Sequence, residues 1–137
     1  MKIITDEKFL RIPSSKITLE EAPSLIKLLE ESLRESEKNG QPGIGLAAPQ
    51  IGISKQVAII RLNKISIDLV NADIETSYDK ALFDQEGCLS FPGKTLRTWR
   101  YKEIVVKNDV WPFNFIATEL LAIAIQHEIG HLKGELY

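Results

Sequence analysis

The residues best suited to catalysis lie in the segment Gln126-His-Glu-Ile-Gly-His131, which reads H-E-x-x-H and contains both histidines of the chain. On a helix, His127 and His131 would lie one turn apart on the same face, so both imidazoles could bind one metal ion. Glu128 could reach a water molecule beside that ion without binding the ion itself. The pattern therefore predicts a metal-dependent hydrolase, and the alternative interpretation is an ion-paired helix face without chemistry.

A catalytic metal usually has three protein ligands and one open position for water. The sequence has no third histidine, so the third ligand is either a carboxylate or the single cysteine, Cys88. We favour Cys88, because a thiolate with two imidazoles suits iron(II), zinc, nickel or cobalt. Taken alone, such a cysteine would instead be interpreted as a small buried hydrophobic residue. One cysteine cannot form an internal disulfide, which indicates a reducing compartment.

A second notable segment is Gly43-Ile-Gly-Leu-Ala-Ala-Pro-Gln50-Ile-Gly52. It contains G-x-G-x-x-A, but a dinucleotide fingerprint must follow a strand and open a helix. Here the segment follows a predicted helix and is interrupted by Pro49. We interpret it as a loop whose glycines allow another backbone to approach, with Gln50 as its polar side chain. A simple glycine-rich turn is the alternative.

Composition places the chain among ordinary soluble globular proteins, with 26% charged and 44% hydrophobic residues. A formal net charge of −2 gives no electrostatic reason to expect nucleic acid or a membrane surface as a partner. The sequence contains no apolar run of transmembrane length, and residues 1–6 lack the apolar core of a signal peptide. These features predict a cytoplasmic protein.

Hydrophobic periodicity predicts helices towards both ends of the chain and strands between them. Thr18-Leu-Glu-Glu21 matches a capping box that opens an amphipathic helix, which ends at Asn39-Gly40. A last helix, preceded by Thr118 as its N-cap, is apolar nearly all round. Strands are predicted at residues 56–62, 67–71, 95–101, 103–107 and 113–116, whereas the polar residues 73–84 are predicted to form an irregular surface segment.

The fold class that follows is α+β, with residues 1–137 forming a single catalytic domain. Antiparallel or mixed sheets are expected to pack around a buried C-terminal helix that carries H-E-x-x-H. The amphipathic N-terminal helix is expected to cover the domain from outside.

Three ordered segments resemble the signature motifs of peptide deformylases: Gly43-Ile-Gly-Leu-Ala-Ala-Pro-Gln50, Glu86-Gly-Cys-Leu-Ser90 and Gln126-His-Glu-Ile-Gly-His131. The resemblance implies removal of the N-formyl group from the starting methionine of newly made proteins, with release of formate.

The resemblance also implies a role for each residue of the site. The metal ligands would be Cys88, His127 and His131, holding one divalent ion, usually iron(II), with zinc, nickel or cobalt as alternatives. Glu128 would serve as general base and acid. Gln50 and the backbone N–H of Leu89 would hold the reacting formyl oxygen.

The helix positions one and two turns before His127 could form part of a pocket for a flexible side chain. They hold Leu120, Ile123 and Ala124, and with Ile44 they match the methionine pocket of the family; plain core packing is the alternative. The backbone at Ile44–Gly45 could pair with an extended substrate.

Two features depart from the family pattern. Gly130 stands where the family usually has aspartate, so a group that supports the metal ligands is expected to be lost. The chain also resembles a short form without the C-terminal helix of many relatives, which puts ribosome docking in doubt. We expect a monomer that acts on formyl-Met nascent peptides in a bacterial cytosol, in host cytosol for a viral source, or in an organelle. An H-E-x-x-H peptidase and an inactive metal-binding remnant that only binds peptides are the competing interpretations.

Overall fold

The computed structural model describes residues 2–136. Its helices are α1 (Glu7–Leu10), α2 (Ala22–Lys38), the 3-10 helix η1 (Ala48–Ile51) and α3 (Glu119–Leu132). Its strands are β1 (Gly45–Ala47), β2 (Val57–Leu62), β3 (Ile65–Val70), β4 (Asp73–Gly87), β5 (Thr95–Lys107) and β6 (Phe115–Thr118).

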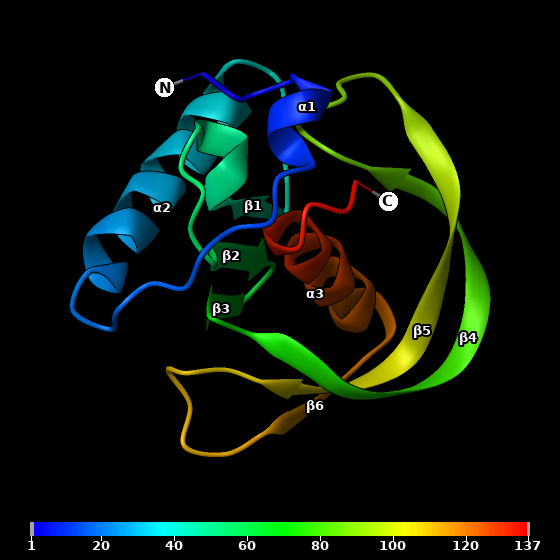
Figure 1. Cartoon of the computed structure of the whole chain (residues 1–137). Coiled ribbons are helices and arrows are strands. Elements are labelled where there is room, and N and C mark those ends of the chain that lie inside the picture. Colours follow the sequence, from blue (N-terminus) through cyan, green and yellow to red (C-terminus); the bar gives the residue numbers. More distant parts are fainter. Residues whose placement is uncertain (1, 137) are drawn as a thin grey trace.

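The strands form two antiparallel sheets, ordered β1-β2-β3 and β4-β5-β6. Helix α3 lies between them, with the long β4–β5 ribbon curving around one side and the β1–β3 sheet on the other (Figure 1). Helix α2 packs on the outer face of the β1–β3 sheet. The predicted α+β architecture, with antiparallel sheets around a buried C-terminal helix, is confirmed.

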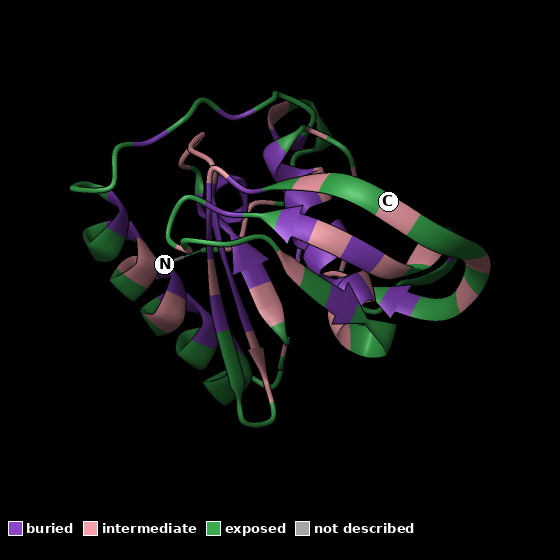
Figure 2. Cartoon of the chain, turned by 90° about the horizontal axis from the view of Figure 1, so that it is seen from below, coloured by how far each residue is buried: buried purple, intermediate pink, exposed green. Residues whose placement is uncertain are grey.

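Helix α2 begins one turn later than the capping box suggests. The Thr18 hydroxyl donates to the Glu21 carboxylate over 2.8 Å, and the Glu21 N–H donates back to Thr18 over 3.3 Å. This reciprocal pair closes a turn that leads into the helix at Ala22. Inside the helix, Leu25, Leu29 and Leu33 bury the apolar stripe against the sheet. Figure 2 shows the same division, with the outward face of the helix exposed.

The expectation of an irregular segment at residues 73–84 is wrong, because these residues belong to the 15-residue strand β4. Within residues 2–136, strand β4 pairs only with β5, so it forms an edge of its sheet. Edge strands tolerate charged residues well. Two register shifts, at Ile74/Thr76 and Phe83/Glu86, also break the simple alternation that reveals a strand in sequence.

The glycine-rich segment is more regular than the predicted loop. Its first part is strand β1, which pairs with β2, and its second part is η1, which carries Gln50. Gly52 ends η1 with a φ of 87°, a conformation that favours glycine.

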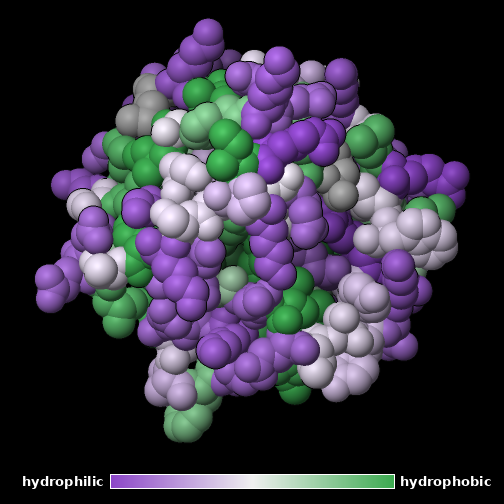
Figure 3. Space-filling model, viewed as in Figure 1, coloured by the Kyte–Doolittle hydropathy of each residue, from purple (hydrophilic) through white to green (hydrophobic). Residues whose placement is uncertain are grey.

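Helix α3 is buried because its sides contact both sheets. Its hydrophobic side chains join a core with residues of β2, β3, β5 and β6. Thr118 occupies the predicted N-cap position, although its side chain makes no capping hydrogen bond in the described part of the chain. Among the described residues, no helix has the length and apolar character needed to cross a membrane. On the face seen in Figure 3, hydrophilic side chains predominate and hydrophobic ones form separate groups.

Candidate active site

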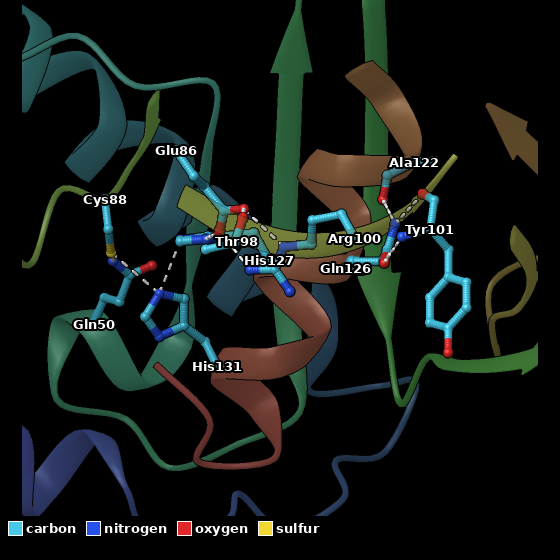
Figure 4. Close-up of polar contacts among 10 residues, drawn as sticks. All are labelled: Gln50, Glu86, Cys88, Thr98, Arg100, Tyr101, Ala122, Gln126, His127 and His131. Carbon is cyan, nitrogen blue, oxygen red and sulfur yellow. Dashed lines mark hydrogen bonds and ion pairs between the residues drawn. The ribbon is translucent and has the colours of Figure 1, made fainter. Parts of the chain in front are cut away.

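Three potential metal ligands converge where the end of β4 meets α3. Cys88 directly follows β4, while His127 and His131 project from consecutive turns of α3 (Figure 4). The distance from Cys88 Sγ to His131 Nε2 is 3.3 Å, and that between the Nε2 atoms of the two histidines is 3.2 Å. Ligand atoms of all three residues lie within 4.8 Å of one another. The sequence therefore predicted correctly that these residues would be neighbours.

This arrangement fits a metal ion. Two ligand atoms placed about 2.0–2.3 Å from a tetrahedral ion lie roughly 3.3–3.5 Å apart. Two of the separations in the cluster, 3.2 and 3.3 Å, are close to that spacing, and the third is no more than 4.8 Å. One thiol and two imidazoles also make a donor set suited to iron(II), zinc, nickel or cobalt.

The side chain of Glu86, which the sequence analysis did not assign a role, holds His127 in place. Its Oε2 lies 2.7 Å from His127 Nδ1, which directs His127 Nε2 towards Cys88 and His131. Glu86 is itself held by an ion pair with Arg100 and by a 2.7 Å hydrogen bond from Thr98. A carboxylate behind a histidine ligand fixes its tautomer and strengthens its basicity.

The two histidines are supported unequally. His131 is fully buried, and its Nδ1 makes no hydrogen bond to any of the described residues. His127 by contrast makes a hydrogen bond through its Nδ1 with the Glu86 carboxylate. Gly130, next to His131, adds no side chain here, and a Cβ built on it would come no closer than 3.7 Å to the Glu135 backbone.

Burial and neighbouring groups shift the pKa values of the site in opposite directions. Burial alone would lower the pKa of His127, but its bonds with Cys88 and Glu86 raise that pKa to about 10. Burial, together with the charge of His127, lowers the pKa of His131 to about 3. Burial also opposes ionisation of Glu86, yet its bonds to Arg100, His127 and Thr98 lower its pKa to about 2. Glu86 is therefore stable as an ion-paired carboxylate. A metal ion bound to Nε2 of His127 and of His131 would replace the proton that His127 holds.

Glu128 lies beside this cluster and is only 3% exposed. Burial raises the pKa of its carboxyl to about 7, so the group can change protonation state near neutral pH. Its Oε1 has no hydrogen-bond partner among the described residues. Gly45 makes room for this carboxylate, since a Cβ at Gly45 would lie 2.5 Å from Glu128 Oε2. The glycine of β1 is thus required mainly by the close approach of a side chain. The sequence predicted the approach of another backbone, and the Ile59 carbonyl oxygen would lie 3.0 Å from the same Cβ.

Gln50 reaches the cluster from η1. Its Nε2 lies 3.5 Å from Cys88 Sγ and 3.1 Å from the hydroxyl of Ser90. Its Oε1 accepts a hydrogen bond from the backbone N–H of Ala47 over 2.9 Å. The amide therefore points its donor end towards the three candidate ligands (Figure 4).

A second glutamine fixes helix α3 against β5. The Gln126 amide accepts from the Tyr101 N–H over 2.9 Å and donates to the Tyr101 carbonyl over 2.7 Å. The side-chain amide thereby makes the same two hydrogen bonds to the Tyr101 backbone that a residue of a neighbouring strand would make. Because Gln126 precedes His127, this contact sets the rotation of the helix at the site.

An open cavity of about 580 Å³ lies over the cluster. Its wall includes ten of the eleven predicted site residues: Ile44, Gly45, Gln50, Cys88, Leu89, Leu120, Ile123, Ala124, His127 and Glu128. The eleventh, His131, lies behind the wall with no exposed surface. Leu120 and Ile44 are 46% and 40% exposed, which excludes the plain-core alternative for these two residues.

Comparisons with known proteins agree on one family. Residues 1–137 match the family model described as polypeptide deformylase. The peptide deformylase of Heliobacterium modesticaldum is 47% identical over 98 residues, covering 69% of this chain and 64% of that protein. Peptide deformylase 2 of Vibrio vulnificus is 36% identical over 135 residues, covering 93% of this chain and 77% of that protein. The crystal structure of a peptide deformylase from Synechococcus elongatus, in complex with actinonin, has a TM-score of 0.86 at 34% identity, covering 100% of this chain and 75% of that one.

Proposed function

Since the chain belongs to the polypeptide deformylase family, we propose that it removes the N-formyl group from the starting methionine of newly made proteins and releases formate. One observation carries the proposal. The ligand atoms of Cys88, His127 and His131 converge beside a cavity that Glu128 and Gln50 also line. An H-E-x-x-H peptidase would more often take a third histidine or a carboxylate as its third ligand.

Cys88 Sγ and the Nε2 atoms of the two histidines are proposed to hold one divalent ion, iron(II) in the native protein, with zinc, nickel or cobalt as alternatives. When bound, such an ion supplies a Lewis acid that makes a water molecule nucleophilic at neutral pH. Glu86 keeps the His127 imidazole aimed at the ion by its 2.7 Å contact with Nδ1.

Glu128 is proposed to move the proton. Its carboxylate accepts a proton from the attacking water and then delivers it to the amine nitrogen that leaves with the peptide. A pKa of about 7, raised by burial, suits both directions of this transfer. The absence of a hydrogen-bond partner on Oε1, among the described residues, leaves that oxygen available for the proton.

The formyl oxygen is proposed to bind the Gln50 amide and the backbone N–H of Leu89. Both residues line the cavity next to Cys88. Gln50 is a neutral donor fixed in a buried position, with 1% of its surface exposed. Fixed donors of this kind stabilise negative charge that develops only in the transition state.

The methionine side chain is proposed to occupy the apolar part of the cavity, between Ile44 of the segment before β1 and Leu120, Ile123 and Ala124 of α3. The peptide backbone would run along β1 at Gly45. Strand β1 pairs only with β2, so its other edge can accept an extended chain in the described structure.

We further propose that residues 1–137 form one catalytic domain that works as a cytoplasmic monomer, without direct contact to nucleic acid or membrane. The net charge of −2 gives no electrostatic reason to expect nucleic acid or a membrane surface as a partner. The half-buried free thiol of Cys88 fits a reducing compartment.

Formate release is the direct test. Protein prepared anaerobically with iron(II) should release formate from a formyl-Met peptide and leave its internal peptide bonds intact. Cleavage of an internal bond would favour a peptidase instead. Binding of the peptide with no formate released would favour an inactive remnant.

A further inference from the structure

The Gln50 side-chain amide has three contacts, with Ala47, Ser90 and Cys88. Its carbonyl oxygen accepts the Ala47 N–H over 2.9 Å. Its nitrogen donates to the Ser90 hydroxyl over 3.1 Å and lies 3.5 Å from Cys88 Sγ. Gln50 and Ser90 are each only 1% exposed, so solvent does not compete for these contacts.

The Ala47 contact decides which end of the amide faces the site. A backbone N–H can only donate, so it selects the carbonyl oxygen of Gln50 and turns the NH2 group the other way. That NH2 group carries two N–H bonds. The Ser90 hydroxyl accepts one of them, and the second therefore points towards Cys88 and the cavity.

The Ser90 hydroxyl is not needed for the turn in which it sits. That turn is closed by a backbone hydrogen bond from the Phe91 N–H to the Cys88 carbonyl over 3.0 Å. Among residues 2–136, the hydroxyl accepts a hydrogen bond from Gln50.

We infer that Ser90 is a positioning residue for the reaction: by accepting one N–H of Gln50, it directs the other towards the formyl oxygen. The inference rests on the proposed deformylase function. It makes the serine of Glu86-Gly-Cys-Leu-Ser90 act on the substrate through Gln50, while the cysteine two residues earlier binds the metal.

A double-mutant cycle with Gln50 tests the inference. Ser90→Ala should lower kcat for a formyl-Met peptide by about 3- to 10-fold, the effect of losing one neutral hydrogen bond, with KM changed less than about 2-fold. In a Gln50→Ala background the same substitution should change kcat by less than about 2-fold, because the group that Ser90 positions is absent. Equal losses in the two backgrounds, or no loss in the native background, would overturn the inference.

Two variants separate positioning from a general effect on the fold. Ser90→Thr keeps the hydroxyl and should retain most of the activity that Ser90→Ala loses. Ser32→Ala removes another buried serine hydroxyl, one that donates to the Leu28 carbonyl within α2 and does not line the cavity. It should lower thermal stability without lowering kcat. Metal content, measured on every variant, should stay the same.

NMR can detect the contact between Gln50 and Ser90 without measuring activity. The side-chain NH2 resonances of Gln50, identified by their loss in Gln50→Ala, should shift in Ser90→Ala and stay in place in Ser32→Ala. Unshifted resonances in Ser90→Ala would refute the contact. If the unaltered protein released no formate, the proposed function would fail, while these resonances would still show whether Ser90 holds Gln50.

Discussion

The Glu86 carboxylate is bound by three side chains, and these contacts determine how the His127 imidazole is oriented towards a metal ion. Arg100 and Thr98 hold the carboxylate from strand β5, and His127 approaches it from α3. Glu86 is 5% and Arg100 is 13% exposed at the side chain, so the two charges depend on one another for solvation. Removing one charge of such a buried pair leaves the other uncompensated.

We predict that Glu86→Gln weakens metal binding about 10- to 100-fold, because His127 loses its charged partner. The free energy of unfolding of the metal-free protein should fall by roughly 3 kcal/mol, because the Arg100 guanidinium stays buried without a carboxylate. Competition against a chromophoric chelator measures the first effect, and urea unfolding measures the second.

Asp84→Asn provides the matched control on the same two strands. Asp84 pairs with Arg97 over 2.7 Å, but both side chains are more than two-thirds exposed, at 68% and 69%. Metal affinity should stay unchanged, since this pair is solvated and distant from His127 in the hydrogen-bond network. Equal losses of metal affinity in the two variants would rule out a special role for Glu86.

Gln50 leads to a separate prediction about turnover. Gln50→Ala should lower kcat by about 100- to 1000-fold, as expected when a fixed donor to a developing oxyanion is removed. The metal should be retained, because Cys88, His127 and His131 are untouched. Rates and metal content measured on one preparation give the answer, and unchanged turnover in a metal-loaded sample would refute the assignment.

At the scale of the elements, the two long helices could be predicted, whereas the longest strand could not. Helix α3 was predictable because it is apolar nearly all round, which is typical of a helix covered on several sides. Strand β4 was not, because its bulges shift the alternation and its edge position admits charged residues. The pairing of Glu86 with Arg100 escaped prediction for the same reason. It depends on the β4–β5 register after the second bulge, which no local pattern in the sequence specifies.

Two glycines near the end of α3 should respond oppositely to alanine. Gly130 is helical, and a Cβ there would meet only ordinary contacts, 3.7 Å or more from Glu135. Gly130→Ala should therefore raise the free energy of unfolding by about 1 kcal/mol, the usual gain over glycine inside a helix.

Gly134 is the matched counterpart, four residues later. Its φ is +80°, and a Cβ there would collide with the Arg11 carbonyl oxygen. Gly134→Ala should destabilise the protein by more than about 1 kcal/mol, through both strain and displacement of the N-terminal segment. Urea unfolding of both variants measures the pair, and stabilisation by alanine at Gly134 would contradict this packing.

For the whole molecule, the site joins three segments that are far apart in sequence: η1, the end of β4, and α3. Their chemistry was predictable because histidine, cysteine and glutamine each mark one segment within a recognisable motif. Their spacing was not, because it depends on α3 packing between both sheets, with Gln126 fixing its rotation against Tyr101. A metal ion bound by Cys88 after β4 and by the two histidines of α3 should therefore stabilise the fold as a whole.

Metal removal tests that coupling. An ion present at about 100 times its dissociation constant stabilises the folded state by about 2.7 kcal/mol, which raises Tm by roughly 10 °C in a domain of this size. Stripping the protein with a chelator should lower Tm by that amount, and adding back zinc should restore it. Cys88→Ala should lose most of this response, since one of the three converging ligand atoms is gone. A full zinc response in Cys88→Ala would show that the ion is held elsewhere. The stabilisation belongs to the joined segments only if the thiol that follows β4 and the histidines of α3 bind the same ion.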